Sequence, residues 1–116
     1  MNEIVLVKEP VKVNILSEII SSTGGDLVKA VIDIRLNIMA IDGEMHSDEE
    51  QFLLGQGSNQ DDLWGINIYP KMPRNEWIEF DSMINIRPRQ NNRSRSVEDL
   101  ELQKKIIQVV NDLILQ

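Results

Sequence analysis

The sequence predicts a single α+β domain in which a mixed, mostly antiparallel sheet carries helices on one face. Two observations lead to this fold class. Apolar and polar residues alternate in several short runs, as in strands with one buried face. Three longer stretches repeat apolar residues every three or four positions, as amphipathic helices do. The segments follow the order β-α-β-β-α-β-β-α, and 116 residues suit one domain spanning 1–116.

The beginning of the chain predicts a strand followed by a helix. Residues 3–7, EIVLV, are the predicted first strand, and Pro10 suits the first turn of a helix, where its missing N–H costs nothing. Gly24 and Gly25 are expected to end that helix. If the strands on either side of it run parallel, the crossover is right-handed. The apolar face of the predicted helix would comprise Val11, Ile15, Leu16, Ile19 and Ile20.

The runs LVKAVIDI, residues 27–34, and IMAI, residues 38–41, predict a hairpin. Three residues separate the runs, and Asn37 suits the left-handed position that such a turn needs.

A short helix is predicted next, within GEMHSDEEQFLLG. Ser47 and Glu50 have the spacing of a capping box. Asp48 and Glu49 would lie in the first turn, where the helix dipole favours negative charge. The buried side would comprise Phe52, Leu53 and Leu54, and Gly55 would end the helix.

A second hairpin is predicted from two runs that resemble each other, LWGINIYP at 63–70 and SMINIRP at 82–88. The register that places apolar residues on one face sets Tyr69 opposite Trp77. The other opposed pairs would be Ile68 with Ile78, Ile66 with Phe80, and Trp64 with Ser82.

The final helix is predicted within residues 97–116, with Ser96 as its cap. Its apolar stripe would comprise Leu102, Ile106, Val109, Val110 and Leu113.

Composition narrows the function classes. The net charge is -7 and the sequence pI is about 4.6, which argues against general nucleic-acid binding because phosphate affinity needs a basic surface. The absence of cysteine excludes disulfides and thiolate chemistry. With no signal peptide and no long apolar run, we expect a cytoplasmic protein without a membrane span.

Three polar clusters are candidate sites. The first is the polar face of the second hairpin, where alternate positions would align in one row. Its carboxylates and amides suit a hard cation or acid–base chemistry, although antiparallel sheets commonly have one solvated face. Its members are Asn67, Glu79, Asp81, Asn85 and Arg87.

The second cluster surrounds His46, the only histidine. A carboxylate beside an imidazole is a common base or metal-ligand arrangement, so Glu44 and His46 are the candidate catalytic pair. The alternative is structural, since the predicted capping box already accounts for Asp48 and Glu49.

The third cluster is the arginine loop, RPRQNNRSRS at 87–96, which holds four of the six arginines and no acid. Arginine matches phosphate and carboxylate in a fork, and a following helix start attracts anions. The alternatives are ion pairs with the protein's own acids, at 42–50 and at Asp61 and Asp62, or a contact between subunits.

Four runs carry a resemblance: GEMHSDEE, DLWGINIYP, WIEFDSMINIRP and NNRSRSVED. Together they resemble a family of short, mostly bacterial proteins of unknown function, over nearly the whole chain. Met45, Ser47, Asn91 and Ser96 depart from its pattern. The resemblance implies no activity. It implies that the recurring polar positions would be Glu44, His46, Asp48, Asn67, Asp81, Asn85, Arg87, Arg93 and Arg95.

The favoured interpretation is a binding module for a small anion, a nucleotide or an acidic partner. Arg93 and Arg95 would grip the anion and Arg87 would support them. Asn67, Asn85 and Asp81 would complete the site. The alternatives are a hydrolase with His46 or Glu44 as base, and a structural role in which the arginines close a homodimer or an internal network. The sequence names no cofactor and no metal site.

Overall fold

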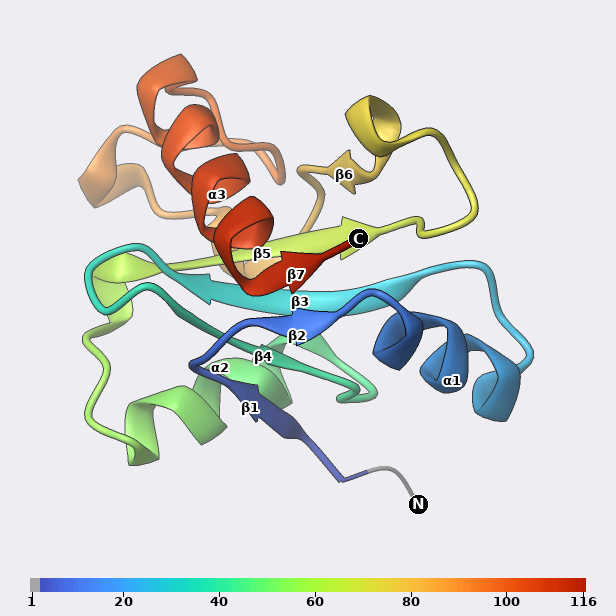
Figure 1. Ribbon diagram of the computed structural model, residues 1–116. Coiled ribbons are helices and arrows are strands. Elements are labelled where there is room, and N and C mark those ends of the chain that lie inside the picture. The colour runs from blue at the N-terminus through green and yellow to red at the C-terminus, as the bar shows by residue number, and fades with distance from the viewer. Residues whose placement is uncertain (1–2) are drawn as a thin grey trace.

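A computed structural model describes residues 3–116 of the protein (Figure 1). The fold is the predicted α+β domain, with a five-stranded sheet of order β1-β4-β3-β5-β6 in which every neighbouring pair is antiparallel. A parallel pair, β2–β7, joins segments from near the two ends of the described chain. The strands are β1 (Val5–Val7), β2 (Val11–Lys12), β3 (Val28–Asp33), β4 (Ile38–Ile41), β5 (Leu63–Ile68), β6 (Ile78–Glu79) and β7 (Ile114–Leu115). The helices are α1 (Asn14–Thr23), α2 (His46–Gly55) and α3 (Leu100–Leu113).

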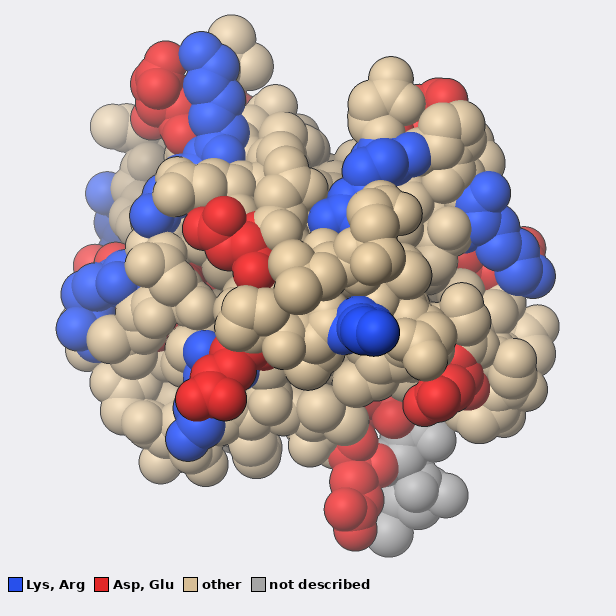
Figure 2. Space-filling view, in the orientation of Figure 1, with Lys and Arg blue, Asp and Glu red and all other residues tan. Residues whose placement is uncertain are grey.

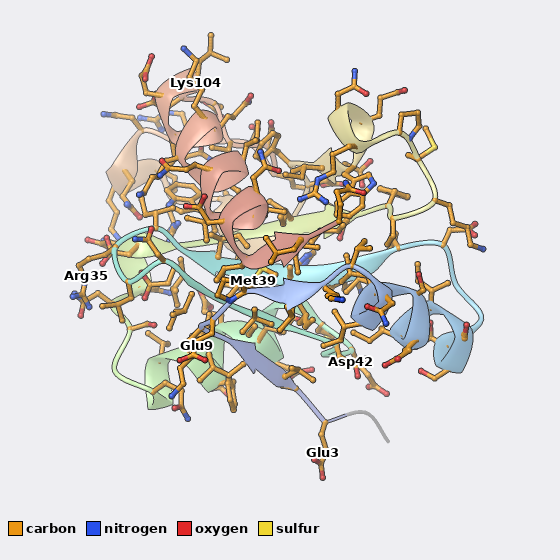
Figure 3. All side chains as sticks on the ribbon, in the orientation of Figure 1. Glu3, Glu9, Arg35, Met39, Asp42 and Lys104 are labelled. Carbon is orange, nitrogen blue, oxygen red and sulfur yellow. The ribbon has the colours of Figure 1, made fainter. Side chains whose placement is uncertain are left out.

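The β3–β4 hairpin confirms the predicted turn. Asn37 takes the left-handed conformation with φ of 56°. The buried carboxylate of Asp33 accepts hydrogen bonds from the backbone N–H groups of Arg35 and Leu36, both at 2.9 Å, and from the Ser58 hydroxyl at 2.6 Å. Arg35 in the turn and Asp42 after β4 mark the two ends of this hairpin (Figure 3).

The helices cover both faces of the sheet, which differs from the expected single face. Helices α1 and α3 pack with Ala30, Ile32 and Ile66 in the larger core, whereas α2 lies on the opposite side (Figure 1). There Leu53 packs with Val31, Ala40 and Leu63. The central strands are apolar on both sides, so each face needs a cover.

The N-terminal helix begins later than predicted. Pro10 lies before β2 rather than in a first helical turn, and α1 starts at Asn14. The parallel pairing with β7 fixes this segment in extended form, and the Val13 N–H donates to the Leu115 carbonyl at 2.7 Å. Gly24 ends α1 with φ of 73°, as expected. Strands β1 and β3 point the same way but are separated by β4.

The second hairpin confirms the predicted register but is much shorter than expected. Asn67 opposes Glu79 and Ile68 opposes Ile78. Beyond Glu79 the segment 82–88 is not a strand; it forms 3-10 turns at Met83–Asn85 and Pro88–Gln90. The expected row of polar side chains from Glu79 to Arg87 therefore does not form.

A side chain replaces the missing strand pairing. The Asn85 amide accepts from the Gly65 N–H at 2.8 Å and donates to the Gly65 carbonyl at 2.9 Å. Both backbone groups of Gly65 are thereby satisfied on the side of β5 away from β3, where no strand pairs with this residue.

Both predicted helix caps are wrong. Met45 is the N-cap of α2 and Ser47 lies inside the helix, so no capping box forms. Asp99, not Ser96, caps α3, accepting from the N–H of Glu101 at 2.9 Å. The expected stripe of α3 does face the core. In α2 Leu53 is buried, while Leu54 is 39% exposed.

Replacing Gly65 with alanine is expected to lower the free energy of unfolding by about 1–3 kcal/mol, because overpacking forces neighbours to move. A Cβ there would lie 2.6 Å from both Cβ and Oγ of Ser82. Urea unfolding measures the effect. Gly55→Ala is the control, since a Cβ on Gly55 meets nothing within 4 Å; equal stability of the two variants would contradict the expectation.

Candidate functional site

A pocket of about 230 Å³ lies where the start of α2 meets β5 and the segment after β6. It brings together four residues from the three predicted clusters: His46, Asn67, Asp81 and Arg95. We call it the His46 pocket. Its further polar lining residues are Lys29, Ser47 and Ser82, and its apolar lining residues are Leu27, Met45, Met83 and Ile84.

His46, the first residue of α2, is held in one orientation. Its Nε2 lies 2.7 Å from the Ile66 carbonyl oxygen. A carbonyl only accepts, so Nε2 carries the hydrogen and Nδ1 of the neutral ring keeps its lone pair. Burial lowers the pKa of His46 below its ordinary value, which favours the neutral ring. No described residue hydrogen-bonds to Nδ1 in residues 3–116.

Gly65 allows this approach. A Cβ at position 65 would lie 3.2 Å from Cδ2 of His46 and still closer to Ser82. The imidazole and Ser82 therefore share the space above a residue that has no side chain. The Ser82 side chain is itself buried and accepts from the Ile84 N–H at 3.3 Å.

Arg95 enters the pocket from the arginine loop. Its Nε donates to Oδ1 of Asp81 at 2.6 Å. Its backbone carbonyl accepts from the Ser82 N–H and from the Asn85 amide, both at 3.0 Å. These bonds fix the backbone, while the two Nη groups donate to no other described residue.

Asn67 joins the polar groups behind the pocket. Its amide donates to Oε1 of Glu79 at 2.9 Å and to the Asp81 carbonyl at 3.3 Å. The Tyr69 hydroxyl donates to the same Glu79 oxygen at 3.0 Å. The side-chain oxygen Oδ1 of Asn67 is buried and has no hydrogen-bond partner among the described residues.

The expected pair of Glu44 and His46 does not converge on this pocket. The Glu44 side chain is exposed, and its backbone carbonyl accepts from Nζ of Lys29 at 2.9 Å. Glu44 lines a neighbouring hollow of about 320 Å³ together with Asp42 and Gly43. Asp48 is exposed in the first turn of α2.

Arg87 is a structural residue. Its guanidinium donates to the backbone carbonyls of Gln60 and Leu63 and stacks on Trp64, 4.1 Å from the ring centroid. Only 6% of it is exposed, and burial lowers its pKa from the ordinary value. Arg87 is therefore not open to a ligand, and neither is the fully buried Asn85.

The arginine loop binds one of the protein's own acids. The carboxylate of Glu98 accepts from the backbone N–H groups of Arg93 at 2.9 Å and Ser94 at 2.8 Å. Hydrogen bonds from Ser94 and from the Arg93 backbone lower the pKa of Glu98. The helix start that was expected to attract an external anion is also occupied, because the Asp99 side chain accepts from the N–H groups of Glu101 and Leu102.

Asn92 closes the loop from within. Its buried amide donates to the carbonyls of Asn85 and Ser96, both at 2.7 Å, and its oxygen accepts from the Glu98 N–H at 2.9 Å. The remaining loop arginines lie outside. Arg89 pairs with Asp61 at 2.5 Å, and the exposed Arg93 side chain has no ion-pair partner among residues 3–116.

Two important residues were missed in the sequence. Lys29 supplies the second positive charge of the His46 pocket. The signal available in the sequence was a charged residue within an otherwise mostly apolar strand. Gly65 gave a weaker signal, as a glycine inside a strand often marks close backbone approach.

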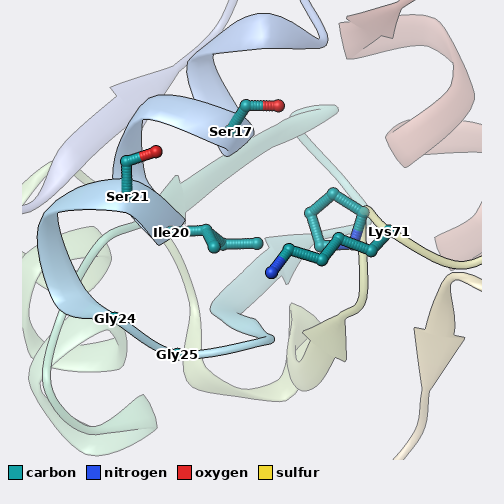
Figure 4. Close-up of a pocket in the computed structure, with 7 residues that line it drawn as sticks. Ser17, Ile20, Ser21, Gly24, Gly25 and Lys71 are labelled. Carbon is teal, nitrogen blue, oxygen red and sulfur yellow. The ribbon is translucent and has the colours of Figure 1, made fainter.

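The rest of the described surface offers less chemistry. A hollow of about 340 Å³ lies between α1 and the loop after β5, with Ser17, Ser21 and Lys71 around it (Figure 4). Acidic and basic side chains are interspersed on the face shown in Figure 2. No three His, Asp or Glu side chains within residues 3–116 are placed to hold a metal ion. None of the described helices is both long and apolar enough to cross a bilayer.

The fold and the pocket define a small α+β domain with one histidine-containing polar pocket. Residues 5–113 match the family described as Protein of unknown function (DUF5674), and the chain belongs to that family. Neither the curated proteins nor the solved structures yield a match.

Arg87→Ala is expected to lower the free energy of unfolding by about 2–4 kcal/mol, because buried carbonyls lose a charged donor. The Gln60 and Leu63 carbonyls are the groups affected. Arg93→Ala is the matched control on the same loop and should change stability by no more than about 0.5 kcal/mol. Chemical denaturation of both variants measures this; similar values would show that Arg87 does not support the fold.

Glu49 is expected to make stability depend on pH. Its carboxyl is fully buried on α2, with one oxygen accepting from the Gly43 N–H at 3.0 Å and the other without a hydrogen-bond partner among residues 3–116. Burial raises its pKa from 4.5 to about 9. The unfolded chain therefore loses this proton at lower pH than the folded one, and the stability contributed below pH 4.5 is lost as pH rises towards 9.

Glu49→Gln keeps the shape of the side chain and removes the group that titrates. Relative to wild type, its free energy of unfolding should rise with pH between these two values, by at most about 1.4 kcal/mol per pH unit. Urea unfolding across this range tests the expectation. Parallel curves for the two proteins would mean that Glu49 is not held protonated in the fold.

Proposed function

We propose that the protein binds a small ligand with a phosphate or carboxylate group in the His46 pocket. The observation that carries this proposal is the meeting of Arg95 and Lys29 with a neutral histidine in one pocket. The lining holds two cations against one carboxylate, Asp81, in a chain of net charge -7. A locally cationic pocket favours an anion.

Each polar group has a role in this proposal. The free Nη groups of Arg95 and the ammonium group of Lys29 pair with the anion. His46 Nδ1 accepts a hydrogen bond from a ligand hydroxyl or amine. Met45 and Met83 are 57% and 66% exposed and contact the ligand's apolar part; flexible methionines adapt to varied shapes.

The proposal reassigns part of the arginine loop. Arg87 and Asn85 hydrogen-bond to backbone groups, so Arg95 is the arginine assigned to the ligand. Arg93 lies outside the lining, and its exposed side chain is available to a second subunit. A homodimer remains a prediction.

A hydrolase is the second candidate, favoured by the free Nδ1 of His46. In this role Nδ1 takes a proton from a water that attacks a phosphoryl or acyl centre, and Arg95 and Lys29 stabilise the negative charge that develops. The bond from that centre to the leaving group then breaks, and the proton on Nδ1 passes to the leaving group. Conversion of a bound ligand would be followed by NMR. Turnover that disappears in His46→Gln while binding persists would favour catalysis over binding alone.

Thermal unfolding in phosphate, sulfate, acetate and a nucleotide panel, at constant ionic strength, tests the binding proposal. A ligand at a hundredfold excess over its Kd adds about 2.7 kcal/mol of stability, a shift of several degrees for a domain of this size. We expect one anion class to give this shift, and the shift to be lost in Arg95→Gln and Lys29→Gln.

Arg93→Ala is the control, because Arg93 lies on the same loop outside the pocket. It should keep the full shift. An equal loss in Arg93→Ala would assign the effect to general charge, and no shift with any anion would contradict the proposal.

A further inference from the structure

A second cavity, larger than the His46 pocket, lies between α3 and the segment that leads into β6. Its volume is about 530 Å³, within the range of small-molecule sites. The surface is hollowed between the two corresponding protrusions at the top of Figure 2. No residue of the His46 pocket lines it.

Its walls are mostly apolar. Trp77, Ile78 and Phe80 form one side, and Ile107 and Val110 of α3 form the other. The indole N–H of Trp77 already donates to the Met72 carbonyl at 3.0 Å, so the ring needs no polar partner from a ligand. Ile107 is 38% exposed, and a ligand that covered it would gain hydrophobic stabilisation.

Arg74 is the only charged residue that the described part of the chain contributes to the lining. Its guanidinium stacks over Trp77, 4.0 Å from the ring centroid. Nη2 donates to the Asn111 side chain at 3.2 Å and to the Ile114 carbonyl at 2.8 Å. These contacts hold the guanidinium in place before any ligand arrives.

The charge of Arg74 is not balanced locally. No carboxylate within residues 3–116 lies in salt-bridge distance of it, although the chain carries 19 acids. Nη1 is buried without a hydrogen-bond acceptor, and Nε donates to no described residue. A fixed arginine lacking an acid, at the edge of an apolar cavity, is complementary to one carboxylate.

We propose that this cavity binds a small amphipathic carboxylate. The carboxylate pairs with Arg74, and an aliphatic or aromatic body lies between Trp77, Phe80 and Ile107. One guanidinium balances a single negative charge, whereas a phosphate would bring more charge than the lining balances. The volume fits a small molecule rather than a protein segment such as a helix.

The test uses octanoate as the probe and the indole N–H resonance of Trp77 in 15N NMR as the readout. Octanoate should shift this resonance saturably. Octanamide has the same chain without the charge and should bind at least tenfold more weakly, while acetate has the charge without the chain and should give no saturable shift. Equal binding of octanoate and octanamide would overturn the proposal.

Two variants separate charge from folding. Arg74→Gln should weaken octanoate at least tenfold. Ile107→Glu places a negative charge at an exposed position in the cavity, so it should weaken octanoate and leave octanamide less affected even if Arg74→Gln does not fold. Arg89→Gln, a change in the arginine loop and away from this cavity, should bind octanoate as wild type does. Unchanged octanoate affinity in Ile107→Glu would refute the site.

Discussion

The arrangement of the His46 pocket depends on two hydrogen bonds between the amide of Asn85 and the backbone of Gly65. Strand β6 covers only part of the edge of β5, and its pairing ends at Asn67 and Glu79. Beyond that point side chains form the hydrogen bonds along the edge. The Asn85 amide bonds to the N–H and carbonyl of Gly65, and the Arg87 guanidinium donates to the Leu63 carbonyl. An amide can imitate the donor and acceptor of a strand neighbour. The chain is then free to turn away, and it carries Asp81 and Arg95 over the sheet towards His46.

The arginines of this acidic protein gather in one loop for several different reasons. Arg87 donates to backbone carbonyls and stacks on an aromatic ring. Arg89 forms an ion pair with the exposed Asp61, and Arg95 lines the His46 pocket. The loop's own backbone binds the carboxylate of Glu98. The side chains therefore look alike in the sequence but act separately. Whether an arginine belongs to a candidate site depends on the direction of its guanidinium group. The spacing of residues along an irregular loop does not determine that direction.

Much of the fold could be predicted because it rests on local rules. Alternation located β3, an apolar run located β4, a single asparagine marked their turn, and the apolar stripe of α3 gave its buried side. The register of β5 with β6 followed from matching apolar faces. The errors arose where a tertiary contact overrides a local signal. Residues around Asn85 have the pattern of a strand, but the Asn85 side chain takes the place of strand pairing. Pairing with β7 keeps the segment after Pro10 extended. Glu49 is buried beside Gly43, although a solvent-exposed carboxylate at the helix start was expected. The convergence of His46 with Arg95 needs the whole sheet and could not be read from spacing.

The β2–β7 pair has a consequence for how the domain folds. Its two strands come from opposite ends of the described chain, so closing it costs more chain entropy than closing the β3–β4 hairpin. Contacts of such long sequence separation slow folding and form after local ones. The β3–β4 hairpin and its turn therefore suit an early nucleus, with β7 docking late. Until that step, the segment after α3 is not anchored and β2 has no strand partner. Unpaired strand edges of this kind can associate with other unfinished chains, so this is the period in which association competes with folding.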